Sequence, residues 1–112
     1  MTDCLFCRIV RGEIPATLVA ESLECLAFRD IAPQAPVHVL VIPREHHGSL
    51  NDVTETATVG AMARLAQEVA RREGILETGY RCVINTGADG GQTVGHLHLH
   101  VLGGRPLGWP PG

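Results

Sequence analysis

Three histidines alternate with small or aliphatic residues near the end of the chain, in the run Gly95-His96-Leu97-His98-Leu99-His100-Val101. Successive side chains of a β-strand point to opposite faces, and the strand rises about 3.3 Å per residue. A strand over residues 96–102 therefore places the three imidazoles on one face at steps of roughly 6.6 Å. The aliphatic side chains occupy the other face. The run predicts a strand with one chemical face and one core face.

Two kinds of chemistry suit such a strand better than purely structural histidines do. Alternating imidazoles can hold a catalytic zinc ion. Alternatively, one imidazole can attack a phosphoryl group while its neighbours donate hydrogen bonds to it. The preceding segment, residues 85–95, contains four glycines, and the backbone N–H groups of such a loop can bind an anion without a lysine. The segment matches neither the dinucleotide fingerprint nor the P-loop.

The rest of the chain predicts an α+β protein with an antiparallel sheet, because its strands group around one long helix without regular alternation. We expect a short helix over residues 5–10 and strands over residues 18–20, 25–28, 37–42 and 80–85. Asp52 with Glu55 is predicted to cap the start of the long helix, and Gly74 its end. An apolar stripe predicts that helix over residues 54–73, with Val59, Met62, Ala63, Ala66, Val69 and Ala70 facing the core.

The length of 112 residues and the net charge of −3 limit the classes of function. We expect one domain, residues 1–112, without room for a second lobe, so any site is shallow or completed by another subunit. The acidic balance argues against nucleic acid or an anionic membrane as a partner. The apolar runs are too short to span a bilayer and the first residues do not resemble a leader, so we expect a soluble, cytoplasmic protein.

The four cysteines fall into two groups. Cys25 and Cys82 lie in apolar runs and are expected in the core. Cys4 and Cys7 form a C-x-x-C pair, which suits either redox chemistry or half of a zinc site.

The histidine run resembles the motif of the histidine triad superfamily, and further segments extend the similarity over nearly the whole chain. It is greatest to the histidine triad nucleotide-binding branch, whose members are purine nucleoside phosphoramidases. The segments that carry it are Cys4-Leu5-Phe6-Cys7-Arg8-Ile9, Glu13-Ile14-Pro15, Leu26-Ala27-Phe28, Asp30-Ile31, Pro33-Gln34-Ala35-Pro36-Val37-His38, Val41-Ile42-Pro43, Gly90-Gly91-Gln92 and Trp109-Pro110-Pro111-Gly112.

The resemblance implies a fold and an activity. The fold is a five-stranded antiparallel sheet with one long helix and a short N-terminal helix, joined across a homodimer into ten strands. The activity is hydrolysis of the P–N bond of purine nucleoside 5′-phosphoramidates and related adenylates, which releases AMP or GMP and requires no cofactor. His98 would attack the α-phosphorus and form a nucleotidyl-histidine. His100 would donate to a phosphate oxygen, His96 would support the cluster, and His38 would complete it.

The resemblance also implies binding residues. Asp30 would accept hydrogen bonds from the ribose, and Trp109 would reach toward the partner's site in the C-terminal tail. Further residues expected at the nucleotide are Ile31, Asn85, Gly91, Gln92 and Thr93. The positions that match a structural zinc site of some relatives are Cys4, Cys7, His46 and His96.

Departures from the family pattern and two alternative functions remain open. Gly95 and Thr93 stand where relatives commonly have a bulky residue and a serine, which leaves the leaving-group preference open. One alternative is a nucleotide-binding sensor or scaffold without turnover. The other is a metal-dependent hydrolase with His96 and His98 as ligands. His47 alone has no expected role and is predicted to face solvent.

Overall fold

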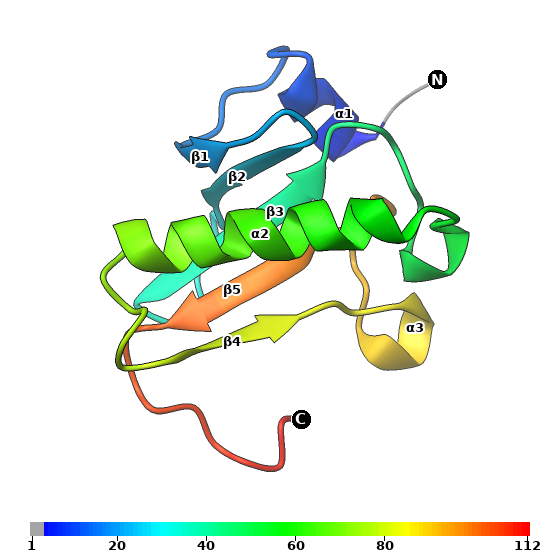
Figure 1. Cartoon of the computed structure of the whole chain (residues 1–112). Coiled ribbons are helices and arrows are strands. Elements are labelled where there is room, and N and C mark those ends of the chain that lie inside the picture. The colour runs from blue at the N-terminus through cyan, green and yellow to red at the C-terminus, as the bar shows by residue number, and fades with distance from the viewer. Residues whose placement is uncertain (1–3) are drawn as a thin grey trace.

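A computed structural model describes residues 4–112, in which five antiparallel strands form one sheet (Figure 1). The strands lie in the order β1-β2-β3-β5-β4, so β3 is central and the edges are β1 and β4. Their bounds are β1 (Leu18–Glu21), β2 (Cys25–Arg29), β3 (Val37–Pro43), β4 (Tyr80–Val83) and β5 (Leu99–Gly103). The expected class, α+β with a five-stranded antiparallel sheet, is confirmed.

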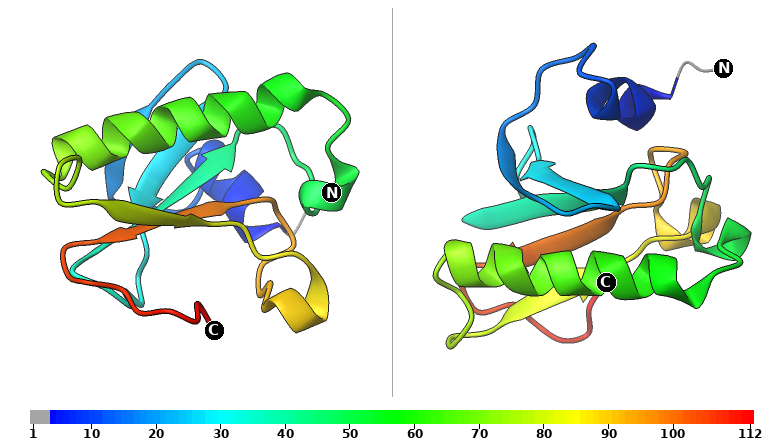
Figure 2. Two further views of the ribbon diagram at one scale, coloured as in Figure 1. Left: turned by 60° about the horizontal axis from the view of Figure 1, so that its bottom comes forward. Right: turned by 45° about the horizontal axis from the view of Figure 1, so that its top comes forward.

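Helices cover both faces of the sheet. The long helix α2 (Thr56–Arg72) crosses one face, and the short helix α1 (Leu5–Val10) lies over the other (Figure 2). A 3-10 helix (Leu50–Asp52) precedes α2, and the one-turn helix α3 (Gly87–Gly90) follows β4. Within residues 4–112, no helix has the length and apolar character needed to cross a membrane. Residues 1–3, which bear on the expected lack of a leader, lie outside the described residues.

Strand β3 shows how the sheet separates two cores. All seven of its residues are buried, because the strand has neighbours on both edges and helices over both faces. Val39 and Val41 pack into the core beneath α2, whereas Leu40 and Ile42 belong to the core beneath α1. Since side chains alternate along a strand, His38 faces the α1 side with Leu40. The position of His38 is therefore set by the alternating hydrophobic pattern of its strand.

Helix α2 ends at the glycine cap that the sequence predicts. The N–H of Ile75 donates to the carbonyl of Ala70 at 3.0 Å, and the N–H of Gly74 donates to the carbonyl of Arg71 at 3.3 Å. Gly74 has φ of 73°, a left-handed conformation that costs glycine little. These two bonds form a Schellman cap, so the expected role of Gly74 is confirmed.

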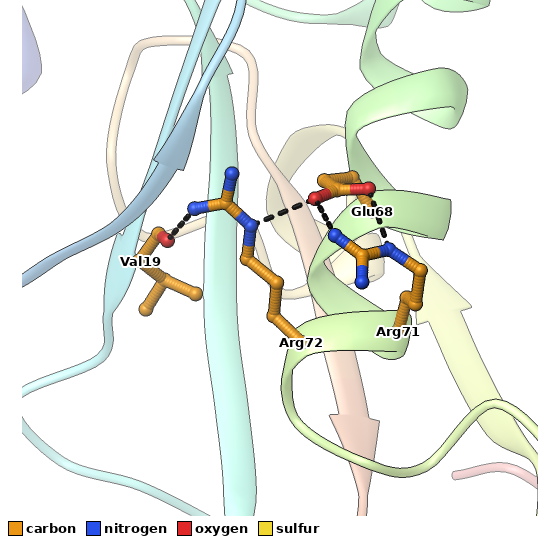
Figure 3. A network of polar contacts seen from close by, with 4 residues as sticks. All are labelled: Val19, Glu68, Arg71 and Arg72. Carbon is orange, nitrogen blue, oxygen red and sulfur yellow. Dashed lines mark hydrogen bonds and ion pairs between the residues drawn. The ribbon is translucent and has the colours of Figure 1, made fainter.

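The same end of α2 is tied to the edge of the sheet by a network of polar contacts (Figure 3). The carboxylate of Glu68 accepts hydrogen bonds from Arg71 and, at 2.7 Å, from Arg72. Arg72 also donates to the carbonyl of Val19 in β1 at 2.8 Å. The two guanidinium groups lower the pKa of Glu68 to about 2.

Three expectations about α2 and the cysteines were wrong. Glu55 caps α2 without a side-chain hydrogen bond, because Asp52 instead forms a capping box with Ser49 on the 3-10 helix. Ala63 is exposed, since it lies at the margin of the buried arc, whose members are Met62, Leu65, Ala66, Val69 and Ala70. Cys82 is also exposed, because it lies on the edge strand β4.

The strand that carries the histidines begins later than expected. Strand β5 starts at Leu99, so residues 96–98 precede it. The N–H of Leu97 donates to the carbonyl of His47 at 2.7 Å. The carbonyl of His96 contacts the ring of His98. These contacts replace ladder bonds to a neighbouring strand. Strand β4 likewise ends at residue 83, and the loop over residues 87–95 contains α3.

Candidate active site

Three histidines cluster on the α1 side of the sheet. His38 belongs to β3 and His100 to β5, and His98 is the residue that immediately precedes β5. The ring centroids of His98 and His100 are 5.0 Å apart, and those of His38 and His100 are 5.1 Å apart. His38 and His98 are 6% and 4% exposed. The structure thus brings together three of the four residues expected to be catalytic.

The fourth, His96, points elsewhere. Its side chain is fully buried, and its Nδ1 lies 3.3 Å from the sulfur of Cys4. The expected regular strand through His96 is therefore wrong, because β5 begins only at Leu99, although the rings of His96 and His98 both contact Phe6 of α1. Among the described residues, no cluster of possible metal ligands contains both His96 and His98, as the alternative metal-dependent mechanism requires.

The hydrogen bonds of His38 fix which of its nitrogens carries the proton. The backbone N–H of Gln34 donates to Nδ1 of His38 at 3.0 Å, so in the neutral ring Nε2 bears the hydrogen. Nε2 lies 2.9 Å from Nδ1 of His100 and donates to it. The ring of His100 therefore carries its own hydrogen on Nε2. That nitrogen is buried and has no hydrogen-bond partner among residues 4–112, so it is a donor available to a ligand.

One nitrogen of the His98 ring is hydrogen-bonded, and the other has no hydrogen bond to the described part of the chain. Nδ1 of His98 lies 2.7 Å from the carbonyl oxygen of His96, which can only accept. Nδ1 consequently carries the hydrogen, and Nε2 presents a lone pair. A neutral imidazole with one nitrogen held in this way is prepared for nucleophilic attack through the other.

Asp30 links the cluster to the edge of the site. Its Oδ1 accepts from the N–H of Ala32 at 2.8 Å, and its Oδ2 lies 3.4 Å from Nε2 of His38. The carboxylate therefore holds a tight turn and contributes a negative charge beside the imidazoles. Asp30 has lone pairs left to accept hydrogen bonds from a ligand.

Burial keeps His38 and His100 neutral. Burial, together with the neighbouring rings of His98 and His38, lowers the pKa of His100 to about 4 against the opposing charge of Asp30. Burial also lowers the pKa of His38, although the Asp30 charge opposes this shift. Near pH 7 both rings are therefore neutral, which preserves the order of donors and acceptors described above.

We expect the free energy of unfolding to decrease as the pH falls from 7 to 4. The pKa of His100 is about 4 in the folded chain against an ordinary value of 6.5, so the unfolded chain binds more protons between these values. The sign is therefore loss of stability with acidification, at most about 3 kcal/mol from His100. Denaturant unfolding across this range measures it. His100→Asn should show a shallower pH dependence, and an unchanged slope would contradict the argument.

A pocket of about 670 Å³ opens beside the cluster. Asp30, His98 and His100 lie at one side of it, together with Ile31 and Thr93. These five are the expected nucleotide-binding residues that line it. Its apolar wall comes from α1 and the sheet, and includes Leu5, Phe6, Ile9, Ile14, Phe28 and Leu40. A pocket of this size, mostly apolar with a few convergent polar groups, is typical of small-ligand sites.

The other expected nucleotide-binding residues do not line this pocket. Both ends of the Gln92 amide are used within the protein: Oε1 accepts from Gly87, and Nε2 donates to the carbonyls of Gly48 and Val94. Its side chain therefore joins loops. The residues that line the pocket do not include Asn85, Gly91 or Trp109 either.

The tail carries Trp109 at the surface of the molecule. Its side chain is 82% exposed, with the guanidinium of Arg81 5.9 Å from the ring centroid. Arg81 also donates to the carbonyl of Gly108 at 2.8 Å, so the tail is fastened to β4.

A second cluster lies next to the first and consists of Cys4, Cys7, His46 and His96, which we call the thiol–imidazole cluster. The possible ligand atoms all lie within 4.8 Å of one another. The sulfur of Cys7 is 3.3 Å from Nδ1 of His46. Two thiolates and two imidazoles form a sound tetrahedral zinc set. Nε2 of His96 also donates to the carbonyl of Pro43 at 2.9 Å, which leaves Nδ1 as the ligand nitrogen.

Some functional groups were missed in the sequence. The Gln34 amide and the Pro43 carbonyl are backbone groups, for which the sequence has no signal. The sequence alone predicts no role for Phe6, although its place between Cys4 and Cys7 is a usable signal. His47 was expected at the surface, but its side chain is 15% exposed because its carbonyl anchors residue 97.

Comparisons with known proteins agree with this geometry. The family model described as HIT domain matches residues 11–107. The chain is 46% identical over 108 residues to a purine nucleoside phosphoramidase of Escherichia coli K12, covering 95% of this chain and 91% of the relative. It resembles the crystal structure of a HIT family hydrolase from Legionella pneumophila Philadelphia 1 (TM-score 0.94, 51% identity, 98% and 100% covered). It also resembles a Zn-bound histidine triad family protein from Mycobacterium smegmatis (TM-score 0.83, 42% identity, 92% and 76% covered).

Proposed function

Because this chain belongs to the HIT domain family, we propose that it hydrolyses the P–N bond of purine nucleoside 5′-phosphoramidates and related adenylates. The observation that carries the proposal is the ordered set of imidazoles at the pocket. Nε2 of His98 presents a lone pair, and Nε2 of His100 presents a hydrogen. A nucleophile and a donor beside one pocket are the two parts that phosphoryl transfer requires.

In the first step, Nε2 of His98 attacks the α-phosphorus and the P–N bond breaks. The departing amine takes a proton from water, and the nucleotidyl group stays on His98. In the second step, water attacks the phosphorus and loses a proton, the bond to Nε2 breaks, and a nucleoside monophosphate leaves. The carbonyl of His96 holds Nδ1–H throughout and stabilises the positive charge that forms on the ring.

The neighbouring imidazoles stabilise the negative charge that develops on phosphorus oxygens. Nε2–H of His100 donates to a non-bridging oxygen, and His38 keeps that hydrogen on Nε2 by donating to Nδ1. Donors that are already oriented act without reorganisation during the reaction. In this arrangement, the backbone N–H of Gln34 orients His38, and His38 in turn orients the Nε2–H of His100 that contacts the substrate.

The pocket suits a purine nucleoside. Apolar side chains such as Phe6, Phe28 and Leu40 offer flat contact to a base. Asp30 lines the same pocket, with Oδ2 3.4 Å from Nε2 of His38, and we assign it to accept hydrogen bonds from the ribose hydroxyls that lie between base and phosphate. We place the substrate accordingly, with the base against α1 and the phosphorus between His98 and His100.

A second copy of the chain completes this proposal. Trp109 is exposed in a tail fastened to β4, and β4 has no strand on its outer edge among the described residues. Pairing of two β4 edges would give the ten-stranded sheet and bury the aromatic residue, as an obligate interface favours. Four expected nucleotide-binding residues lie outside the pocket. In the dimer, the loop around residues 85–92 and the C-terminal tail would bring them to the site: Asn85, Gly91, Gln92 and Trp109.

The thiol–imidazole cluster would hold a structural zinc ion. Its donor set fits zinc, and the Mycobacterium smegmatis relative is described as Zn-bound. Zinc there would cross-link α1 to the segments around residues 46 and 96. All the reacting groups belong to His98, His100 and His38, so no step of hydrolysis uses the metal.

The test is detection of the covalent intermediate. The full chain is incubated with an adenosine 5′-phosphoramidate, quenched under alkaline conditions that preserve a phosphorus–nitrogen bond, digested, and analysed by mass spectrometry while AMP release is followed. We expect an adenylylated peptide carrying His98 and catalytic AMP release. Tight AMP binding without turnover of phosphoramidates or acyl-adenylates would reject hydrolysis and favour the sensor alternative.

A further inference from the structure

Phe6 stands between the two clusters. It lies between Cys4 and Cys7 in the sequence of α1, and it is 4% exposed. Its ring is edge-on to His96 at a centroid distance of 5.8 Å and edge-on to His98 at 5.3 Å. The same ring lines the pocket. One side chain therefore touches a member of the thiol–imidazole cluster, the proposed nucleophile and the space for the base.

His96 makes a second connection between the clusters. Its Nδ1 faces the sulfurs of Cys4 and Cys7 at 3.3 and 3.6 Å. Its carbonyl accepts from Nδ1 of His98 at 2.7 Å. The residue is fully buried, so its ring and its backbone do not shift independently of their surroundings. Contacts that fix the ring of His96 therefore also fix its backbone carbonyl, which accepts the hydrogen bond from His98.

Helix α1 depends on these contacts for its place. It has six residues, far fewer than an isolated helix needs to be stable in water. Its N-terminus is capped by the sulfur of Cys4, which accepts from the N–H of Cys7 at 3.3 Å. Three of its side chains, Leu5, Phe6 and Ile9, form part of the pocket wall. The wall of the pocket is thus held at the same two cysteines that offer ligands to a metal.

We propose that Phe6 is a positioning residue that couples the thiol–imidazole cluster to the nucleotide pocket, so that zinc and a purine mononucleotide strengthen each other's binding. The inference rests on the proposed function, since it assumes that the pocket binds nucleotides. Zinc at the cluster fixes Cys4 and Cys7, which holds the Phe6 ring against His98. A bound nucleotide fixes the same ring from the pocket side. Thermodynamic linkage requires that zinc raise the affinity for the nucleotide by the same factor by which the nucleotide raises the affinity for zinc.

The experiment measures zinc affinity with and without nucleotide. The full chain is freed of metal, and Zn²⁺ is titrated in competition with a chromophoric chelator, first alone and then with saturating adenosine 5′-monophosphate. We expect the zinc affinity to rise about fivefold or more. Calorimetric titration of AMP into the zinc-free and zinc-loaded protein should show the same factor.

Two matched variants separate coupling from general damage. Phe6→Leu keeps an apolar side chain in the core but loses the ring edge, so zinc still binds and the factor falls toward one. Phe28→Leu makes the same change in the same pocket and core, on a ring that contacts Phe6 at 5.4 Å and belongs to β2. This control should bind AMP less tightly but retain the coupling factor.

A spectroscopic readout reports on the nucleophile itself. In ¹⁵N spectra of the imidazoles, zinc should shift the ring nitrogens of His98 in the wild type and not in Phe6→Leu. Zinc affinity that is indifferent to AMP would overturn the coupling and leave the proposed function standing. Absence of AMP binding in both metal states would overturn the proposed function. Equal loss of coupling in both variants would show that Phe6 has no special part.

Discussion

Substitution of His98 by Asn should lower kcat for an adenosine 5′-phosphoramidate by at least about 1,000-fold, with little change in AMP affinity. The side chain of Asn is smaller than that of His, but its amide nitrogen takes the place of Nδ1 and can still donate to the carbonyl of His96. It has no nitrogen lone pair that can attack phosphorus, so the covalent intermediate cannot form. Steady-state AMP release measures the loss, and calorimetric AMP titration shows that the pocket remains intact.

The matched control is His47→Asn, the same change at a histidine outside the pocket. Within the described residues, Nε2 of His47 has no hydrogen-bond partner, and the anchoring contact of this residue is made by its backbone carbonyl. This variant should keep kcat within about twofold of the wild type. Turnover by His98→Asn at a comparable rate would mean that water attacks phosphorus directly, and the two-step mechanism would be wrong.

Substitution of Gly104 by Ala should destabilise the chain by roughly 2–4 kcal/mol. Gly104 has φ of 90°, and a Cβ there would lie 2.8 Å from Cβ of Pro36 and 3.4 Å from the backbone nitrogen of Val37. Neither atom belongs to a flexible side-chain end, so the backbone must move. Denaturant unfolding at pH 7 measures the effect.

The same substitution should also reduce kcat by about tenfold, because Pro36 lies midway between Gln34 and His38. A shift there lengthens the hydrogen bond that sets the tautomer of His38. Gly60→Ala is the control of opposite sign: nothing lies within 4 Å of its Cβ position, and it is inside α2. It should stabilise by about 0.5–1 kcal/mol. Unfolding midpoints that move together in the two variants would contradict the argument.

The sheet was predictable from the sequence because its strands carry strong local signals. Residues 37–42 form a dense β-branched run between prolines, and the structure makes this the central strand with Pro43 as its last residue. The end of α2 was equally clear from Gly74. The beginning of α2 was not predictable in this way, because the side chain of Asp52 forms a capping box with Ser49 on the 3-10 helix and does not cap α2.

The residues of the candidate site were predictable, but their geometry was not. Alternation alone put His96, His98 and His100 on one face, and the resemblance added His38, Asp30 and the four possible ligands. The break in the strand depends on contacts from His47 and on the side chain of His98 turning back to its own chain. Such contacts join distant segments or depend on side-chain rotamers, and neither leaves a local pattern. The same holds for Gln92, whose amide the fold uses three times.

The ring and the backbone carbonyl of His96 make separate contacts, and this separation affects how the sequences of related chains diverge. Its carbonyl serves the nucleophile and its ring serves the thiols. Any amino acid supplies the carbonyl, whereas Nδ1 of the ring is needed as a ligand only while cysteines stand at positions 4 and 7. In a descendant that loses both cysteines, selection on residue 96 relaxes to a demand for size and burial, while residues 98 and 100 stay fixed. Substitutions at positions 4, 7, 46 and 96 should consequently appear together across a set of orthologues, and independently of the other histidines.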